Sequence, residues 1–478
     1  MTNRAGVTAL VTLAMLNVFT LGAGVAVAGM LPARLALWQV PRVTGAALAG
    51  PGPAPAPAGA RAPLPSRRKL AAVLAPLISA RPLGPHVGAI VTDLDTGAVL
   101  YSQQAGSAFV PASSAKLLTA VAALRTLGPS ARFTTRVVTG PGAGSLTLVG
   151  GGDPTLAAGR PPRADYPQPA TLAALAAATA RWLHARGERR IRLSYDTSLF
   201  TGPLTAPGWT PSYISTGNVT PITSLEVDQG RLTTAGAPQD ADDPDNFRPR
   251  SLTPAAAAAA AFAGLLRRDG IHVAGRPAPG RAPRGATAVA AVRSPALAAI
   301  VGWMLRESNN VIAEDLARQV ALHTHRPASF AGAAAAVTAV LGRLGVHRGI
   351  HLVDGSGLSP LDRLTPGALA AVVRLAAAGR QSALRAAITG MPVAGFAGTL
   401  APGQSVFGSF GPPALGMVRA KTGNLARVAS LAGIAADASG QVLAFALMAD
   451  QIPRGSLLGS AAGTIDAMAT ALAACGCR

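Results

Sequence analysis

The sequence predicts a chain of mixed α/β (α+β) structure in which an antiparallel sheet is flanked by helices. Apolar residues recur at helical spacing along residues 70–80 and 115–127. Two apolar runs surround the turn residues Asp95, Thr96 and Gly97, a pattern typical of a β-hairpin. Two further apolar strands near the C-terminus are joined by a turn at residues 437–440.

Length and composition narrow the class of protein. The chain has 478 residues, enough for two or three domains, and 49% hydrophobic with 13% charged residues excludes disorder throughout. The formal net charge is +21, yet only 4% of residues are aromatic and no segment interleaves aromatic with basic residues. We therefore expect no nucleic-acid partner.

The N-terminal region predicts export. Residues 5–31 form an uncharged run of 27 residues, long enough to cross a bilayer, so we expect an uncleaved membrane anchor. The small residues of "AVAG" at 26–29 leave a cleaved signal peptide as the alternative. Residues 32–69 are rich in proline and alanine and predict an extended spacer. Both alternatives place the remainder outside the cytoplasm, in the cell envelope or secreted.

Lysine is rare in this chain, which has 39 arginines but only Lys69, Lys116 and Lys421. Arginine stays protonated at any accessible pH, whereas a lysine that is desolvated or crowded by another cation can lose its proton. The general use of arginine for positive charge therefore suggests that a surviving lysine is kept for its titratable amine.

The stretch "VPASSAKLLTAVAALRTLG" places a serine three residues before Lys116. Residues three apart share a helix face, so Ser113 faces Lys116 while Ser114 points away, and Ser113 is the candidate nucleophile. The unpaired N–H groups of a helix start favour negative charge beside it. Alone, the pattern also fits a helix N-cap beside an exposed lysine. The same spacing in "SRRK" at 66–69 lies in the spacer and predicts only a solvated basic run.

Two more short motifs follow in order, "SNN" at 308–310, near the start of a run of helical period, and "KTG" at 421–423, at the end of a strand. The order Ser-x-x-Lys, Ser-x-Asn, Lys-Thr-Gly resembles the penicillin-recognising serine enzymes. The stretches "LVGGGDPTL", "PITSLEVDQG", "DGSGLS" and "MPVAGFAGTL" extend the resemblance to class C low-molecular-mass penicillin-binding proteins, the D-alanyl-D-alanine carboxypeptidase/endopeptidase family. It covers about residues 70–474.

The resemblance implies a penicillin-recognising serine transpeptidase-like domain built from residues 70–135 and 290–478. An inserted β-rich region, of one or two domains, then occupies residues 136–289, after the anchor or signal (1–31) and the spacer (32–69). The interval of 195 residues between Ser113 and Ser308 leaves room for this insertion, whereas a compact β-lactamase has none.

The resemblance also implies roles for eight residues. The expected catalytic residues are Ser113, Lys116, Ser308 and Asn310, and the expected substrate-binding residues are Lys421, Thr422, Gly423 and Asn424. The oxyanion would be bound by the backbone N–H groups of Ser113 and Asn424. The implied partners are peptidoglycan stem peptides, with β-lactams as inhibitors, and no cofactor or metal is expected.

Two positions depart from the family pattern. Many relatives carry threonine at 424 and aspartate at 309, where this chain has asparagine. The backbone N–H of Asn424 can still serve the oxyanion, but its side-chain contact with substrate is in question.

The sequence is also compatible with two other functions. A β-lactamase or esterase could use the same motifs, and a catalytically idle protein could bind the cell wall through its basic surface. The balance between carboxypeptidase and endopeptidase activity is also undetermined. Glu314 is expected to be a structural partner, and Asp153 and Asp354 to cap turns. Cys475 and Cys477 are compatible with a local disulfide, a link to another molecule or free thiols.

The N-terminal segment generates a prediction. If residues 5–31 are an uncleaved anchor, the mature protein should sediment with membranes and retain its N-terminal residues. Fractionation and mass spectrometry of the N-terminal peptide measure these two properties. A mature chain that begins near Gly29 and accumulates in the medium would show that the segment is cleaved.

Overall fold

The computed structural model describes residues 64–159, 166–232, 248–379, 381–410, 412–454 and 458–477. The predicted anchor (1–31) and nearly all of the predicted spacer lie outside these ranges. None of the helices within the ranges has the length and apolarity that a membrane span requires.

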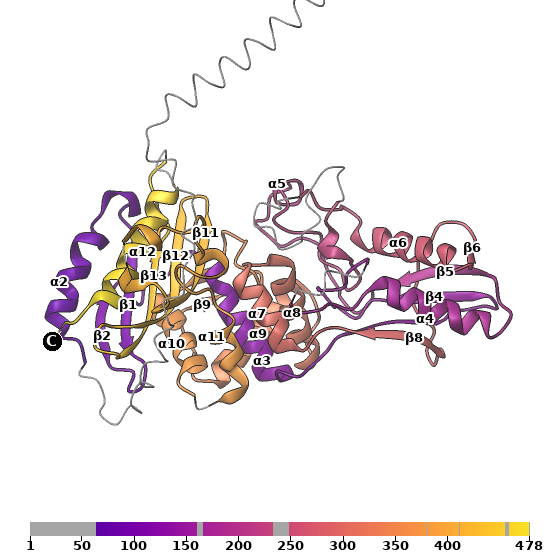
Figure 1. Cartoon of the computed structure of the whole chain (residues 1–478), viewed down its shortest axis with the longest axis horizontal. Helices are drawn as coiled ribbons and strands as arrows, with labels where there is room; N and C mark the ends of the chain where they lie inside the picture. Colours follow the sequence, from indigo (N-terminus) through magenta and orange to yellow (C-terminus); the bar gives the residue numbers. More distant parts are fainter. Residues whose placement is uncertain are drawn as a thin grey trace, which may run out of the picture. The chain divides into compact units, whose positions relative to one another are not determined.

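A five-stranded antiparallel sheet is formed by strands from both ends of the described chain (Figure 1). Its order is β11-β12-β13-β1-β2, so the first long strand pairs with the last one of the chain. The expected hairpin turns at residues 95–97 and 437–440 are confirmed, because they join β1 to β2 and β12 to β13. The strands are β1 (Val87–Asp93), β2 (Val99–Gln103), β11 (Val418–Leu425), β12 (Val428–Ala436) and β13 (Val442–Ala449).

Helices α2 (Arg67–Ile78) and α12 (Leu458–Ala474) cover one face of this sheet. Leu74, Phe445 and Met468 belong to the apolar core between them. Helix α2 begins at Arg67, within the last residues assigned to the spacer, and Lys69 lies exposed in its first turn.

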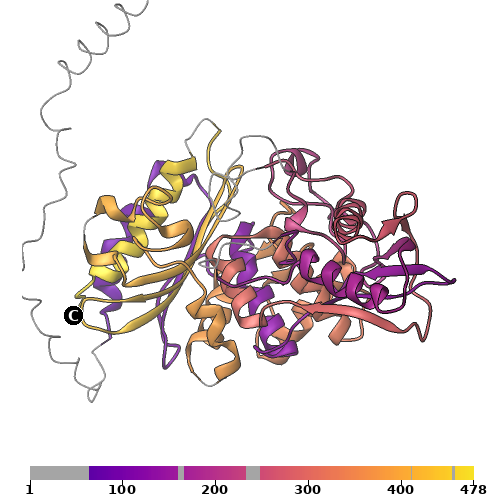
Figure 2. The ribbon, with the colours of Figure 1, turned by 45° about the vertical axis from the view of Figure 1, so that its right-hand side comes forward.

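The other face carries a group of helices, and Figure 2 shows the sheet between the two helical layers. At its centre lies α3, whose residues from Lys116 to Leu124 are all buried. This complete burial explains the continuous apolar run that follows Ser113 in the sequence. The helices are α3 (Lys116–Leu127), α7 (Leu297–Arg306), α8 (Asn310–His323), α9 (Phe330–Arg343), α10 (Pro366–Ala377) and α11 (Arg385–Thr389).

A second sheet lies within the segment between α3 and α7. Its order is β6-β5-β4-β3-β8, with β7 also paired to β5, and α4 and α6 pack against its strands. The strand-like runs after residue 132 therefore form strands, whereas the boundaries of the inserted region stay a prediction. The elements are β3 (Thr134–Thr139), β4 (Ser145–Val149), α4 (Leu172–His184), β5 (Arg190–Asp196), α6 (Pro254–Arg268), β6 (His272–Val273), β7 (Ala278–Pro279) and β8 (Ala288–Arg293).

Short elements complete the chain. Cys475 and Cys477, after α12, form a disulfide, which selects one of the three states that the sequence left open. The short elements are α5 (Ser212–Ser215), β9 (Ile350–His351), β10 (Arg363–Leu364) and the 3₁₀ turns η2 (Arg81–Leu83), η3 (Ala112–Ala115), η4 (Asp228–Gly230), η5 (Ser382–Leu384), η6 (Gly398–Leu400), η7 (Phe407–Phe410) and η8 (Pro412–Ala414).

Three buried carboxyl groups meet where α8 contacts the loop after β4. Gln319 of α8 donates to the carbonyl oxygen of Gly151 at 2.9 Å, and Asp153, Glu226 and Asp315 are all buried nearby. Asp153 caps a turn as expected, because its Oδ1 accepts from the backbone N–H of Thr155.

The carboxyl oxygens of Glu226 and Asp315 have no hydrogen-bond partner among the described residues. Burial raises the pKa of Asp315 well above its ordinary value. Glu314 and Asp153 raise it further, while Arg318 opposes them. Burial likewise raises the pKa of Glu226. These groups therefore stay protonated in the folded chain at pH values where they ionise in the unfolded chain.

We predict that Asp315→Asn stabilises the protein at alkaline pH. The folded state keeps a proton that the unfolded state has lost, so the stability of the native chain falls as pH rises above about 4 and until the folded pKa is passed. The asparagine variant lacks this penalty, and its melting temperature should exceed that of the native chain by more at pH 8 than at pH 5. The surface substitution Asp269→Asn is the control; equal pH dependence in all three proteins would contradict the prediction.

Candidate active site

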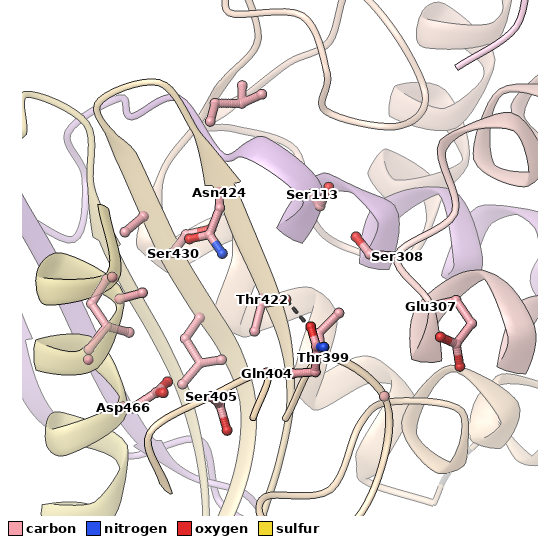
Figure 3. Close-up of a pocket in the computed structure, with 18 of the residues that line it drawn as sticks. Ser113, Glu307, Ser308, Thr399, Gln404, Ser405, Thr422, Asn424, Ser430 and Asp466 are labelled. Atoms are coloured by element: carbon pink, nitrogen blue, oxygen red, sulfur yellow. Dashed lines mark hydrogen bonds between the residues drawn. The ribbon is translucent and has the colours of Figure 1, made fainter. Parts of the chain in front are cut away.

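Residues from the three sequence motifs line one cleft of about 850 Å³. Ser113 comes from η3, Ser308 and Asn310 from the junction of α7 and α8, and Thr422 and Asn424 from β11. Figure 3 shows Ser113, Ser308 and Thr422 around the same opening. The structure thus brings together segments that are 195 and 113 residues apart in the sequence.

Ser113 and Ser114 differ in the way the sequence predicts. Ser113 is half-buried and lies beside the cleft. Ser114 is fully buried, and its hydroxyl donates to the carbonyl oxygen of Pro111 at 2.7 Å. Ser430 of β12 donates to the same carbonyl at 2.7 Å, which anchors the turn to the sheet. Of these two adjacent serines, Ser113 is therefore the one available for attack on a substrate.

Lys116 has no exposed surface and lies within hydrogen-bond distance of three oxygens. Its Nζ is 2.7 Å from Ser113 Oγ, 2.6 Å from Asn310 Oδ1 and 2.9 Å from the carbonyl oxygen of Ser356. Burial lowers the pKa of Lys116 from 10.5 to about 7, although Asp354 and Glu314 act in the opposite direction. The neutral amine is therefore accessible near neutral pH.

The Ser-x-Asn motif lies at a break between two helices inside the run of helical period, because α7 ends at Arg306 and α8 begins at Asn310. Ser308 has a φ of +54°, a left-handed conformation that ends the run of α7. Asn309 then caps α8, because its Oδ1 accepts from the N–H of Ile312 at 3.0 Å. The break leaves Ser308 beside the cleft and Asn310 at the first position of α8, where its Nδ2 donates to the carbonyl oxygen of Asn218 at 2.8 Å.

Lys421 is the second fully buried lysine. It donates to Ser308 Oγ at 2.9 Å and to the carbonyl oxygen of Thr422 at 2.8 Å. Burial lowers the pKa of Lys421 well below its ordinary value, and the neighbouring Lys116 lowers it further, while Glu307 raises it. Each of the two lysines therefore contacts one cleft serine, and the charge of Lys116 disfavours a charge on Lys421.

Gly423 is required by close packing between β11 and the turn that carries Ser113. A Cβ atom at this position would lie 2.6 Å from the carbonyl oxygen of Pro111 and 3.0 Å from the backbone nitrogen of Ser114. Glycine therefore allows the strand to approach the nucleophile turn. On either side of it, Thr422 Oγ1 lies 2.9 Å from Thr399 Oγ1, and Asn424 is exposed (Figure 3).

Three residues that contact the site lie outside the three sequence motifs: Ser356, Asn218 and Thr399. The stretch "DGSGLS" points to Ser356, and "MPVAGFAGTL" to Thr399, because both belong to the family resemblance. Asn218 lies in the unremarkable stretch "TGNVT" and acts through its backbone carbonyl, so no side-chain pattern could reveal it.

The turn that contains Ser356 is held by acidic residues. Asp354 Oδ1 accepts from the N–H of Gly357 at 2.6 Å, and its Oδ2 accepts from the N–H of Ser359 and from Trp209 Nε1. The expectation that Asp354 caps a turn is thus confirmed. In the described part of the chain, no cluster of three or more His, Cys, Asp and Glu side chains is arranged to hold a metal ion.

Known proteins share both the sequence and the architecture. The chain is 40% identical to the carboxypeptidase DacB of Mycolicibacterium smegmatis over 422 residues, 87% of this chain and 86% of that protein. It is 29% identical to a D-alanyl-D-alanine carboxypeptidase of an Actinomadura species, covering 76% and 78% of the two chains. The crystal structure of penicillin-binding protein 4 from Haemophilus influenzae superposes with a TM-score of 0.69 at 22% identity, over 86% of this chain and 98% of that chain.

The last comparison supports the expected penicillin-recognising fold, with an antiparallel sheet and an additional β-rich region. The model of the D-Ala-D-Ala carboxypeptidase 3 (S13) family matches residues 70–251 and 234–472. This range contains all three motifs and nearly the whole of the described structure. The chain is therefore a member of the D-Ala-D-Ala carboxypeptidase 3 (S13) family.

Proposed function

We propose that this chain is a serine-type D-Ala-D-Ala carboxypeptidase that cleaves peptidoglycan stem peptides through an acyl-enzyme on Ser113. The observation that carries the proposal is the 2.7 Å contact between Ser113 Oγ and the fully buried Nζ of Lys116. A serine hydroxyl needs a base within hydrogen-bond reach to become a nucleophile.

The partners of Lys116 suit a neutral amine. A neutral amine has two hydrogens and one lone pair, and two of the three oxygens around Nζ, those of Asn310 and Ser356, can only accept hydrogen bonds. Once both hydrogens are donated to them, the lone pair is left for the hydroxyl hydrogen of Ser113. Lys116 can then take this proton as Oγ attacks the carbonyl carbon between the two D-alanines.

Proton delivery to the leaving amine is assigned to Ser308. Its Oγ accepts a hydrogen bond from Lys421 at 2.9 Å, and the residue lines the cleft with Ser113. The hydroxyl can pass its proton to the departing D-alanine while it recovers one from Lys116 or Lys421. Both lysines are buried and their pKa values are lowered, which favours transfer of a proton away from nitrogen.

The terminal carboxylate of the substrate is assigned to Lys421 and Thr422. A point charge together with a hydroxyl suffices to bind a carboxylate. The developing oxyanion would lie between the backbone N–H groups of Ser113 and Asn424, one from a helix start and one from a strand. Water then hydrolyses the ester on Ser113. Since Asn424 is exposed, its side chain is free to contact the substrate and influence specificity.

The family acts on the cell wall, so the chain works outside the cytoplasm. We further propose that residues 5–31 anchor it to the membrane, because they form an uncharged run of sufficient length. A β-lactam complex has been determined for the Haemophilus influenzae penicillin-binding protein 4, which supports β-lactams as inhibitors of this chain.

We predict that a fluorescent penicillin labels the protein covalently at Ser113. Ser113→Ala should abolish both the label and the release of D-alanine from a stem pentapeptide, because among the described residues Ser113 supplies the hydroxyl that contacts Lys116. Ser114→Ala is the matched control and should keep the label, since Ser114 is buried against Pro111. Gel fluorescence and mass spectrometry of the labelled peptide measure the result; undiminished labelling of Ser113→Ala would refute the assignment.

Digestion of cross-linked and uncross-linked muropeptides by the native protein then measures the balance of endopeptidase and carboxypeptidase activity.

We predict that Lys116→Arg slows acylation by the roughly 10² to 10⁴-fold typical of a lost general base. Arginine keeps the positive charge but has no titratable amine. Stopped-flow acylation measures the rate, and a melting curve checks that the variant folds. Lys421→Arg should lose less, because a guanidinium still binds a carboxylate, and Lys69→Arg, on the exposed start of α2, should match the native protein. Equal rates for the variants at 116 and 69 would show that Lys116 is not the base.

A further inference from the structure

The third partner of Lys116 is a backbone carbonyl, so its position depends on the turn that carries it. The carbonyl oxygen of Ser356 accepts from Lys116 Nζ at 2.9 Å. It belongs to the loop between β9 and β10, and neither strand lies in the five-stranded sheet that contains β11. A shift of this loop would move an acceptor on which the neutral amine depends.

The carboxylate of Glu314, on α8, holds this turn in place. It accepts from the N–H of Gly355 at 3.0 and 3.1 Å and from the N–H of Ser356 at 2.8 Å. The side chain of Glu314 has no exposed surface. Glu314 lies four residues after Asn310 on the same face of α8. One helix therefore contacts Lys116 directly through Asn310 and indirectly through Glu314 and Ser356.

The charged groups around Glu314 come from three segments. Arg318, on the next turn of α8, lies 3.5 Å from Glu314 Oε2, and Asp315 follows Glu314 on the same helix. Asp354 faces it from the turn, and Lys116 from α3. Burial, and after it the charge of Asp354, raise the pKa of Glu314 from 4.5 to about 7 against the opposing effect of Arg318 and the turn N–H groups. The negative charge of Glu314 in turn raises the pKa of Lys116.

We propose that Glu314 is a positioning residue of the acylation step, which holds the Ser356 carbonyl against Lys116 and supplies a negative charge that stabilises the protonated lysine. This role rests on the proposed function of Lys116 as base. In that step the O–H bond of Ser113 breaks, its proton moves to Lys116 Nζ, and the Oγ–C bond forms while the carbonyl electron pair moves to oxygen. Glu314 gives and takes no proton in it.

The charge is tested with Glu314→Gln, which keeps an oxygen for the N–H groups of Gly355 and Ser356. Acylation by a fluorescent penicillin is measured from pH 5 to pH 9. The native rate should rise through the pKa of Lys116, about 7, as the amine becomes neutral. Glu314 carries its full negative charge only above its own pKa of about 7. Without that charge the ammonium form loses stabilisation, so the midpoint of the rise should move to lower pH, by up to about one pH unit. A midpoint that stays in place overturns the electrostatic role.

The positioning is tested with Glu314→Ala and Thr119→Val. Alanine leaves the N–H of Gly355 without its acceptor, and the N–H of Ser356 keeps only Asp354 Oδ1, at 3.1 Å. The plateau rate should therefore fall about 10- to 100-fold, and glutamine should restore most of it. Thr119 holds the same turn without charge, because its hydroxyl donates to the Gly355 carbonyl at 2.6 Å. Thr119→Val should therefore lower the plateau without moving the midpoint. This variant tests the positioning role if the Glu314 variants do not fold. Unchanged plateaus in both variants overturn the positioning role.

Glu188→Gln, in the loop before β5, is the matched control and should reproduce the native profile. Failure of the proposed function is distinguishable, because label would then persist in Ser113→Ala, or Lys116→Arg would acylate at the native rate, whatever residue stands at 314. A folded Glu314→Gln that acylates slowly at every pH, with its midpoint unmoved, would mean that Glu314 has only a structural role.

Discussion

The burial of two lysine side chains in one polar pocket is the constraint on which the rest of the site depends. Lys116 and Lys421 have no exposed surface, and each lies against a cleft serine. An isolated buried ammonium group is costly, so the structure surrounds each amine with oxygens from several elements. The cost of charging these amines is also what makes them useful, because it brings a strong base into the range of neutral pH.

This constraint explains why the site is assembled from rigid elements. The nucleophile turn is tied to the sheet by the hydroxyl groups of Ser114 and Ser430, which both donate to the carbonyl oxygen of Pro111. Glycine at 423 permits the strand to approach that turn. The helix break at Ser308 then brings a second hydroxyl to the cleft without distorting α8, because Asn309 caps the new helix. Packing and capping thus set distances that the chemistry needs.

Sequence reasoning identified the motif side chains because their chemistry is rare in this composition. Lysine scarcity and three-residue spacing led to Ser113 and Lys116, and apolar periodicity predicted α3 and the hairpins. It did not predict the break at Ser308, since apolar residues continue on both sides at helical spacing and only a positive φ interrupts them. It also could not find the carbonyl of Asn218, because a backbone acceptor leaves no trace in the residue type.

The pairing of β1 with β13 has a consequence for the time at which the protein becomes active. These strands are separated by most of the described chain, and residue 87 faces residue 449 in the register. Contacts between such distant segments form late, because a long loop must close first. A chain that is synthesised from its N-terminus contains Ser113 long before it contains β11 and Lys421. The active site is therefore complete only when nearly the whole polypeptide has been synthesised.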